Sequence, residues 1–564
     1  MKVIIVGGVA GGATAAARIR RLDEHAEIIV FERSGYISYA NCGLPYYIGD
    51  VITDPEELTL QTPESFFKRF RINMKIHHEV ISIHPERKTV SVKNLENGEI
   101  FEEKYDKLIL SPGAKPTQPR LPGVGMDKLF TLRTVEDTFR IKEYINKNHP
   151  KSAVLAGGGF IGLELAENLR ELGMDVTIVQ RPKQLMNPFD PDMASMIHNE
   201  MRKHGIKLVL GYTVEGFKEK DNGVEVLLKD NPSLQADMVV LAIGVTPDTV
   251  LAKEAGLELG IKESIVVNDR METSVPDIYA AGDAVQVKHY VTGNDALISL
   301  AGPANKQGRI IADNICGGDS RYLGSQGSSV IKVFDMTAAT TGINETNAKK
   351  SGLEVDTVIL SPMSHAGYYP GGKVMTMKVV FEKETYRLLG AQIIGYEGVD
   401  KRIDVLATAI HAGLKATQLK DLDLAYAPPY SSAKDPVNMA GFMIDNIAKG
   451  TLKQWHLEDM DKISKDKSVV LLDVRTVGEF NRGHMDGFRN IPVDELRERI
   501  NEIEKGKPVY LICQSGLRSY IASRILEGNG YETYNFSGGF RFYDAVVNDR
   551  ALIERAYACG MELI

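Results

Sequence analysis

Two glycine-rich turns, each following an apolar strand and opening a helix, constrain the fold of this chain more than any other feature. The first is Gly7-Gly8-Val9-Ala10-Gly11-Gly12, and the second is Gly157-x-Gly159-x-x-Gly162. Glycines at this spacing let the backbone approach a pyrophosphate at a helix N-terminus, where unpaired N–H groups and the helix dipole favour an anion. Tight packing of strand against helix explains one such turn but not the pair. The sequence therefore predicts two dinucleotide-binding units.

The two units differ in the residue that ends their second strand. The apolar run 28–31 ends on Glu32, whereas the run 176–179 ends on Gln180, which Arg181 follows. A carboxylate at this place hydrogen-bonds a free ribose 2′-hydroxyl, and a nearby arginine accommodates a 2′-phosphate instead. We therefore expect an adenosine ribose at Glu32. At the second site the pattern favours NADPH over NADH and leaves the use of both open.

Length, net charge and cysteine content limit the number of domains, the kind of partner and the cellular compartment that we expect. The chain has 564 residues, enough for about three to five domains at roughly 100–200 residues each. Its net charge of −8 gives no reason to expect a nucleic-acid partner, because a basic patch is the usual footprint. Four widely spaced cysteines suit a reducing compartment. With no apolar run near the ~20 residues of a membrane span and no signal-peptide h-region, we expect a soluble, cytoplasmic protein.

Three further segments carry a family resemblance. The strand-like run 105–110 leads into Ser111-Pro112-Gly113, Glu164 closely follows the second fingerprint, and the run 277–281 ends on Gly282-Asp283. Together with the two fingerprints, these segments resemble the FAD-dependent pyridine nucleotide-disulfide oxidoreductases across residues 1–445. Val9, in place of the middle glycine of the first fingerprint, departs from the family pattern but is familiar in one of its branches.

The resemblance implies an α/β fold with two Rossmann-like dinucleotide-binding domains and an α+β dimerisation domain. We expect an FAD-binding domain at 1–112 and 238–324, an NAD(P)-binding domain at 113–237, a dimerisation domain at 325–445 and a linker at 446–456. The implied assembly is a homodimer.

The same resemblance assigns cofactor-binding residues. Glu32 is expected to hold the FAD ribose, Asp283 to bond the ribityl chain or pyrophosphate, and Glu164 to lie beside the nicotinamide. No metal is expected. The full set expected to bind FAD or NAD(P)H is Gly7, Gly8, Val9, Ala10, Gly11, Gly12, Glu32, Arg33, Ser111, Pro112, Gly113, Gly157, Gly159, Gly162, Glu164, Gln180, Arg181, Gly244, Gly282 and Asp283.

The absence of a second cysteine near Cys42 indicates which branch of the family the chain resembles. Cys42 lies in Ser38-Tyr39-Ala40-Asn41-Cys42-Gly43-Leu44-Pro45, and position 47, where disulfide reductases with a Cys-x4-Cys pair have a second cysteine, is Tyr47. Single-cysteine NADH oxidases and peroxidases carry a histidine in the first glycine turn, where this chain has Ala10. The segment is similar to the signature of the coenzyme A disulfide reductases. A buried cysteine that acts as a small hydrophobe is the alternative. The chemistry needs a thiolate, which a nearby positive charge or a helix N-terminus would favour.

The resemblance also implies a coenzyme A groove and a contribution from the second subunit. Thr14, Arg18 and Arg21 are spaced by four and three residues, so they share a helix face. The two arginines either grip phosphates or complement the helix dipole. Tyr368 and Tyr426 are expected to reach Cys42 of the partner subunit, with ordinary packing as the alternative. The residues expected to line the groove are Thr14, Arg18, Arg21, Ser38, Asn41, Asn305 and Lys434.

The last segment, 457–564, indicates a separate small α/β domain. The apolar strand 509–512 ends at Cys513, which opens the loop Cys513-Gln514-Ser515-Gly516-Leu517-Arg518 before a helix. Such a loop aims successive backbone N–H groups at the sulfur and stabilises an anion. The segment resembles a rhodanese domain, which implies that Cys513 carries a persulfide and that Arg518 is catalytic. A degenerate binding module is the alternative. Cys316 and Cys559 lie in no motif and are expected to be structural.

The two halves together predict a flavin enzyme that reduces coenzyme A persulfide or disulfide with NAD(P)H. Cys513 would receive sulfane sulfur from polysulfide and hand it to the thiol of coenzyme A, which acts as substrate or as a bound arm. Cys42 would then cleave the persulfide. Two alternatives stay open: an NADH oxidase or peroxidase with a sulfenic acid cysteine, and a non-enzymatic sulfur carrier or redox sensor.

Overall fold

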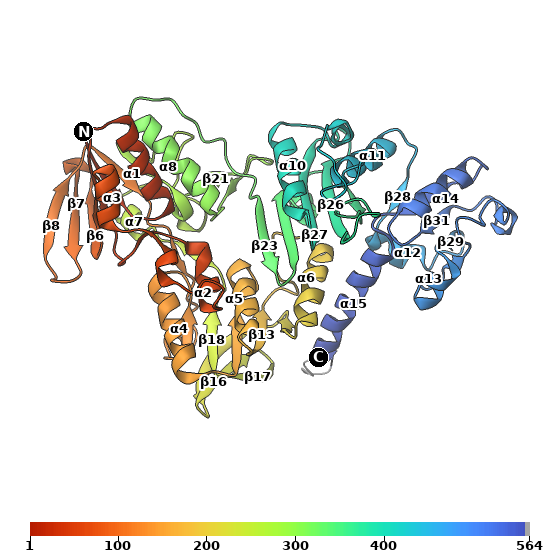
Figure 1. Cartoon of the computed structure of the whole chain (residues 1–564), viewed down its shortest axis with the longest axis horizontal. Helices are drawn as coiled ribbons and strands as arrows, with labels where there is room; N and C mark the ends of the chain where they lie inside the picture. The colour runs from red at the N-terminus through yellow and green to blue at the C-terminus, as the bar shows by residue number, and fades with distance from the viewer. Residues whose placement is uncertain (559–564) are drawn as a thin grey trace. The chain divides into compact units, whose positions relative to one another are not determined.

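The computed structural model describes residues 1–558, and Cys559, expected to be structural, lies outside this range (Figure 1). The chain forms two compact units. The first contains 1–182 and 205–327, and the second contains 183–204 together with the chain from residue 328 onward.

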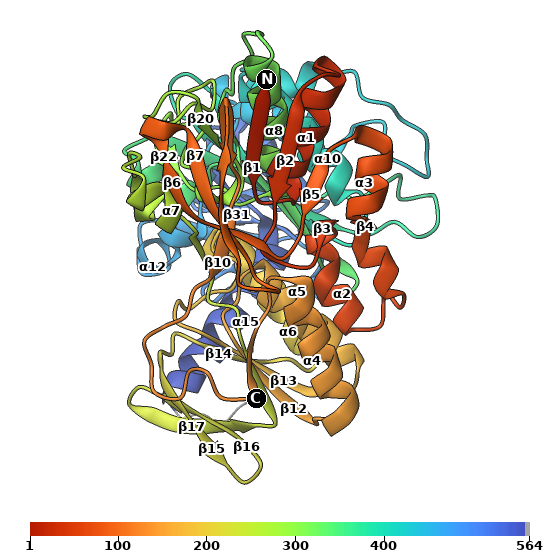
Figure 2. The same ribbon diagram turned by 90° about the vertical axis from the view of Figure 1, so that its left-hand side faces the viewer.

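A five-stranded parallel sheet forms the core of the N-terminal half of the first unit. Its order is β20-β9-β1-β2-β5, and Val3 of β1 pairs with Ile28 on one side and Lys107 on the other. Residues 3–6 are buried, as in parallel sheets whose two faces are both covered. Helices α1 and α8 lie side by side next to this sheet (Figure 2). The bounds are β1 Lys2–Val6, β2 Glu27–Phe31, β5 Asn73–Lys75, β9 Lys107–Leu110, β20 Ile278–Ala280, α1 Ala10–Leu22 and α8 Ala301–Ile315.

A second five-stranded parallel sheet has the order β11-β18-β12-β13-β14. Its strands are β11 Leu129–Thr131, β12 Ser152–Ala156, β13 Asp175–Gln180, β14 Lys207–Leu210 and β18 Met238–Leu241, with helices α4 Val135–Asn148 and α5 Phe160–Glu171. The first sheet places a glycine turn between β1 and α1, and the second places one between β12 and α5, so the two expected Rossmann-like domains are confirmed. Smaller antiparallel sheets accompany them, namely β6 His78–His84, β7 Thr89–Asn94 and β8 Ile100–Lys104, and β15 Val214–Lys220, β16 Gly223–Leu228 and β17 Asn231–Ala236.

The second unit begins with an antiparallel sheet of order β23-β24-β27-β26-β25, which confirms the expected α+β domain. In strand β26 every residue except the last is buried. Helix α10 packs on β24 and β27, and α6 packs on β23 and β27. The bounds are β23 Ser329–Val333, β24 Met336–Gly342, β25 Val355–Leu360, β26 Met375–Glu382, β27 Leu388–Gly395, α6 Pro191–Lys203, α9 Glu345–Lys350, α10 Val399–His411 and α11 Pro436–Ala448.

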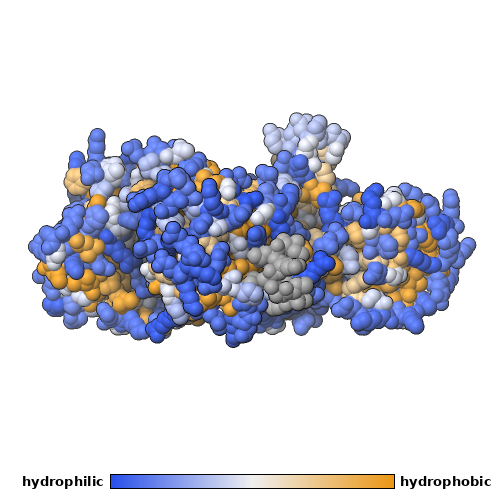
Figure 3. Space-filling view, turned by 90° about the horizontal axis from the view of Figure 1, so that it is seen from below, coloured by the Kyte–Doolittle hydropathy of each residue, from blue (hydrophilic) through white to orange (hydrophobic). Residues whose placement is uncertain are grey.

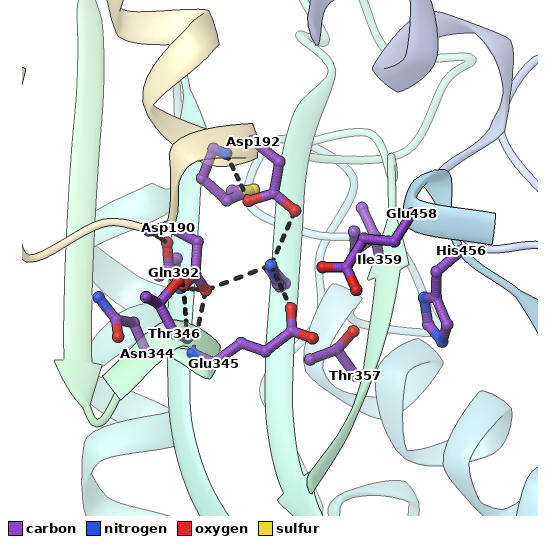
Figure 4. Close-up of polar contacts among 12 residues, drawn as sticks. Asp190, Asp192, Asn344, Glu345, Thr346, Thr357, Ile359, Gln392, His456 and Glu458 are labelled. Atoms are coloured by element: carbon purple, nitrogen blue, oxygen red, sulfur yellow. Dashed lines mark hydrogen bonds and ion pairs between the residues drawn. The ribbon is translucent and has the colours of Figure 1, made fainter. Parts of the chain in front are cut away.

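Lys378 is a fully buried lysine in the middle of β26. Its ammonium group lies 2.8 Å from the carboxylates of Asp192 and Glu345 and 3.2 Å from that of Asp190 (Figure 4). These three carboxylates outweigh the effect of burial and raise the pKa of Lys378, which therefore stays charged. The cluster joins β26 to α9 and to the start of α6.

Segment 183–204 was expected inside the NAD(P)-binding domain, yet it groups with the second unit. Asp190 accepts hydrogen bonds from Thr346 and Gln392. The Nδ1 of His198 lies 2.8 Å from the carboxylate of Asp549 on α15 Gly539–Ala558. These buried polar contacts, made by residues distant in sequence, explain the grouping.

The C-terminal domain has a five-stranded parallel sheet of order β28-β32-β31-β29-β30. Its first strand, β28, lies in the expected linker 446–456, where Trp455 is buried and donates from Nε1 to the carbonyl of Leu511 at 3.3 Å. Because α11 also extends to Ala448, the segment is structured at both ends. The bounds are β28 Gln454–Trp455, β29 Val470–Asp473, β30 Arg489–Asn490, β31 Val509–Ile512, β32 Thr533–Phe536, α12 Met460–Ile463, α13 Val477–Arg482 and α14 Leu517–Glu527.

The face of the molecule in Figure 3 is mainly hydrophilic, with hydrophobic side chains scattered among polar ones. Among the helices of residues 1–558, none combines the length and the apolar character needed to cross a membrane.

Removal of the Lys378 ammonium would leave three carboxylates without their shared cation. We expect Lys378→Met to lower the free energy of unfolding of the second unit by about 3–5 kcal/mol, the usual effect of breaking a buried ion pair. Urea titration followed by circular dichroism measures the loss. The control is Lys453→Met, which removes the exposed pair with Glu532 and should have little effect. Equal midpoints for both variants would contradict a stabilising role for the cluster.

Candidate functional site: two glycine turns and two cysteines

The first glycine turn is held closely against the end of β9. Gly7 has a φ of +96°, and a Cβ there would come within 2.1 Å of the carbonyl oxygen of Ser111. The backbone N–H of Gly8 donates to Glu32 Oε2 at 2.8 Å, and the N–H and hydroxyl of Ser34 donate to Oε1. The turn and the carboxylate expected to bind the adenosine therefore lie side by side, an arrangement that fits a dinucleotide.

The second glycine turn has the same architecture. Gly157 has a φ of +119°, and a Cβ there would meet the carbonyl oxygen of Ala242 at 2.2 Å. Gly159 differs, because its φ is ordinary and a Cβ would meet no atom within 4 Å. The open space above Gly159 leaves room for a pyrophosphate to approach the backbone. Gln180 accepts from the N–H of Gly158 at 3.1 Å, and Arg181 is exposed next to it.

The remaining residues expected at the cofactors surround these turns. Val9 precedes α1, Ala10 is its first residue, and Gly11 and Gly12 are buried within it. Gly162 lies in α5, where a Cβ would meet the carbonyl oxygen of Gly157. Arg33 pairs with Asp248 at 2.9 Å. Ser111 follows β9 directly and Pro112 comes next, while Gly113, Gly244 and Gly282 all have positive φ.

Cys42 lies in a short 3₁₀ turn, Asn41–Gly43, immediately before helix α2 Leu44–Ile48, and its side chain is exposed. Although the side chain is exposed, nearby protein atoms partly shield the thiol from water and thereby raise the pKa of Cys42, and the carboxylates of Glu164 and Asp283 add to this effect. The guanidinium of Arg133 acts in the opposite direction. A thiolate favoured by positive charge is expected from the sequence, but the net effect of these protein groups is to favour the thiol.

Arg133 is a site residue that the sequence analysis missed. It follows β11, and its guanidinium pairs with the carboxylate of Asp283 at 2.6 Å. Asp283 was expected to bond the ribityl chain or pyrophosphate, and one of its oxygens is engaged by this pair. No motif marks Arg133, because its partner lies 150 residues further along the chain.

Glu164 lies on α5 near Cys42. Burial, with a further contribution from the carboxylate of Glu167, raises the pKa of Glu164 to about 7. This carboxyl group therefore changes charge near neutral pH, and its anionic form opposes ionisation of Cys42.

The residues expected to bind coenzyme A are only partly brought together. The hydroxyl of Thr14 donates to Asn305 at 2.5 Å across the contact of α1 with α8. Arg18 is engaged by Asp313 at 2.8 Å, whereas Arg21 is exposed at the end of α1. Ser38, with a φ of +44°, donates its N–H to the carbonyl of Gly8, and Asn41 precedes Cys42. Lys434 is exposed and belongs to the second unit.

Tyr368 and Tyr426 form an exposed pair in the second unit. Their hydroxyl groups lie 2.6 Å apart, and their side chains are 75% and 45% exposed. The hydrogen bond to Tyr368 raises the pKa of Tyr426. Exposure of this extent argues against ordinary packing within one chain as the role of the two rings.

Cys513 lies at the end of β31 and is buried. Its sulfur accepts hydrogen bonds from the backbone N–H of Gly516 at 3.1 Å and from the hydroxyl of Ser519 at 3.2 Å. The expected cradle of successive N–H groups is thus replaced by one N–H and one hydroxyl. Both groups are donors that could hydrogen-bond a sulfur anion.

The guanidinium of Arg518 is bound by a carboxylate from another helix. Its guanidinium donates two hydrogen bonds of 2.7 Å to the carboxylate of Glu479 on α13. The pair lowers the pKa of Glu479 to about 2, so that this carboxylate is ionised.

Within residues 1–558, no group of three or more His, Cys, Asp and Glu side chains is arranged to hold a metal ion.

The chain is similar to known protein families along most of its length. It matches the pyridine nucleotide-disulphide oxidoreductase family over residues 1–308, the dimerisation domain of that family over 328–436, and a rhodanese-like domain over 456–545. The chain belongs to the pyridine nucleotide-disulphide oxidoreductases, as the sequence analysis predicted.

The chain is also similar to individual proteins and solved structures over most of its length. Coenzyme A disulfide reductase of Staphylococcus aureus (strain JH9) is 38% identical over 442 residues, which cover 78% of this chain and 99% of that protein. The crystal structure of reduced CoADR-RHD from Bacillus anthracis is 48% identical, with a TM-score of 0.95 and coverage of 97% of this chain and 98% of that one. An NAD-dependent persulfide reductase from A. fulgidus is 38% identical, with a TM-score of 0.90 and coverage of 96% and 100%.

Glu164→Gln would remove a carboxylate that opposes ionisation of Cys42. We expect the pKa of Cys42 to fall, so that iodoacetamide labels the dithiothreitol-reduced variant about two- to fivefold faster than wild type at pH 8. Since Glu164 is protonated below its pKa of about 7, the difference should vanish below about pH 6. Mass spectrometry of the Cys42 peptide measures labelling.

The control for this prediction is Glu99→Gln, an exposed carboxylate in the same unit. It should label like wild type at every pH. Identical labelling of Glu164→Gln and wild type at pH 8 would show that Glu164 does not act on Cys42.

Proposed function

We propose that this chain is a flavin-dependent oxidoreductase that reduces coenzyme A disulfide and coenzyme A persulfide with NADPH or NADH. The observation that carries the proposal is the exposed side chain of Cys42, with Tyr47 where a partner cysteine would stand. A cysteine without a partner cysteine cannot form an internal disulfide. We therefore expect its catalytic cycle to pass through a disulfide with the sulfur of a substrate. The relatives named as a coenzyme A disulfide reductase and a persulfide reductase support this sulfur chemistry.

The residues around the glycine turns fit the two dinucleotides. The first turn with Glu32 would hold FAD, and the second turn with Gln180 and Arg181 would hold NAD(P)H. Bound FAD would supply hydride acceptance from NAD(P)H and transfer of the electron pair to sulfur.

At Cys42 the chemistry is thiol–disulfide exchange. The Cys42 thiolate attacks one sulfur of coenzyme A disulfide, which forms a mixed disulfide and releases a coenzyme A thiolate. With coenzyme A persulfide the same attack on the inner sulfur releases hydrosulfide. Two electrons and one proton then regenerate the Cys42 thiolate and free coenzyme A thiol. Desolvation and ionised Glu164 disfavour the attacking thiolate, whereas Arg133 favours it, so both residues influence the pH at which the attack begins.

The binding groove and the second subunit complete the proposal. Thr14, Arg18, Arg21, Ser38, Asn41, Asn305 and Lys434 would contact coenzyme A. The exposed pair of Tyr368 and Tyr426 supports a homodimer in which these phenols donate hydrogen bonds to the thiolate that leaves Cys42 of the partner subunit. A cytoplasmic location would suit chemistry that depends on free thiols.

The rhodanese domain would supply the persulfide. Cys513 would take a sulfane sulfur from polysulfide, and the coenzyme A thiolate would then attack the outer sulfur of the Cys513 persulfide. This step forms coenzyme A persulfide and returns the Cys513 thiolate, which Gly516 and Ser519 stabilise.

Anaerobic oxidation of NADPH, followed by absorbance with coenzyme A disulfide, coenzyme A persulfide, polysulfide or hydrogen peroxide, tests this division of labour. We expect Cys42→Ser to abolish turnover of all sulfur substrates. Cys513→Ser should abolish only the turnover that starts from polysulfide. Cys316→Ser is the matched control and should behave as wild type. Hydrogen peroxide as the best acceptor, with no effect of Cys513→Ser, would favour an oxidase or peroxidase.

Nicotinamide preference depends on Arg181 in this proposal. We expect Arg181→Ala to raise the KM for NADPH about tenfold more than the KM for NADH, because only NADPH carries the 2′-phosphate. Steady-state kinetics with coenzyme A disulfide measures both constants. An equal change in the two constants would rule out a phosphate contact at Arg181.

A further inference from the structure

Two arginines at the Cys513 loop, Arg518 and Arg475, are already paired with carboxylates. Arg518, the last residue of the loop, forms the two-hydrogen-bond pair with Glu479 described above. Arg475 contacts the loop through Gln514, but its guanidinium is bound by Asp473 at 2.7 Å. Neither guanidinium is left to neutralise an incoming anion.

Glu479 is held in place independently of Arg518. It is the third residue of α13, and the N–H and hydroxyl of Thr476 donate to its Oε2 at 3.0 Å and 2.8 Å. In return the hydroxyl of Thr476 accepts from the N–H of Glu479. This capping box fixes the carboxylate at the start of the helix. Its low pKa keeps it negatively charged at any physiological pH.

The surface beside this ion pair is hydrophobic. Val477 precedes Glu479 by two residues, and Leu517 and Ile521 flank Arg518 on α14; these three side chains are 54%, 65% and 42% exposed. A donor that reaches Cys513 past this surface therefore meets apolar side chains and a neutralised arginine. Such surroundings favour organic groups and low charge.

We propose that Glu479 is a specificity-determining residue that makes Cys513 accept sulfur from singly charged or neutral persulfides and hydropolysulfides in preference to the thiosulfate dianion. This inference rests on the proposed function of Cys513 and names its class of donor. The Glu479 carboxylate cancels the attraction that the Arg518 guanidinium would otherwise exert on a second negative charge of the donor, so a dianion gains nothing from this arginine.

Both donor reactions are balanced in the same way. With a persulfide, the Cys513 thiolate bonds to the outer sulfur, the S–S bond of the donor breaks, and the donor leaves as a thiolate with the electron pair. With thiosulfate, the thiolate bonds to the outer sulfur and sulfite leaves with the electron pair. Only the charge of the donor and of the leaving group differs between them.

The test compares loading of Cys513 in full-length protein by cysteine persulfide, which carries a net charge of −1 with its outer sulfur ionised, and by the thiosulfate dianion, with the added sulfur detected on the Cys513 peptide by mass spectrometry. We expect Glu479→Gln to raise the ratio of the thiosulfate rate to the persulfide rate about tenfold, because it removes the charge and keeps a hydrogen-bonding side chain. Glu479→Ala should shift the ratio in the same direction, and circular dichroism verifies that both variants fold.

The matched control is Glu495→Gln, which removes a carboxylate paired with Arg499 on the surface of the same domain. It should leave the ratio unchanged. A ratio in Glu479→Gln within about twofold of wild type, or wild-type protein that loads from thiosulfate as fast as from persulfide, would overturn the inference. Reduction of coenzyme A disulfide through Cys42, assayed in parallel, tests the proposed function separately, since that reaction does not use Cys513.

Discussion

The approach of the first glycine turn to the end of β9 is the constraint on which the N-terminal site depends. No side chain fits at Gly7, because the carbonyl oxygen of Ser111 occupies the place of its Cβ. This contact sets the position of Gly8, whose N–H binds Glu32 and whose carbonyl accepts from the N–H of Ser38. Since Ser38 begins the segment that carries Cys42, the same turn places both the expected dinucleotide carboxylate and the reactive thiol.

The two cysteines assigned to sulfur chemistry lie in contrasting surroundings. Cys42 is exposed, and the net effect of burial and of Glu164 is to raise its pKa. Cys513 is buried, and its sulfur accepts from one N–H and one hydroxyl. An exposed thiol suits attack on a bulky disulfide, whereas a sulfur surrounded by donors suits storage of a persulfide anion. The contrast agrees with different roles in one reaction sequence.

The sequence predicted those features that depend on residues close together in the chain. Glycine spacing, strand patterns and the acidic end of a strand gave both dinucleotide-binding domains, and the loop from Cys513 to Arg518 gave the rhodanese domain. Arg133 and the cluster around Lys378 could not be found in this way, because the partner of Arg133 and two of the three carboxylates around Lys378, those of Asp190 and Asp192, are more than a hundred residues away. The same limit applies to the pair of Arg18 with Asp313, which lies almost three hundred residues further along the chain. Trp455 was placed in a linker because its buried surroundings come from strands that follow it.

The central claim is that Cys42 forms a mixed disulfide with coenzyme A. The most direct measurement is anaerobic incubation of reduced protein with coenzyme A disulfide in the absence of NAD(P)H, followed by mass spectrometry of the cysteine peptides. The account predicts one coenzyme A moiety on the Cys42 peptide, which NADPH then removes, and none on the Cys316 peptide. A sulfenic acid at Cys42 without coenzyme A, or coenzyme A on another cysteine, would contradict it.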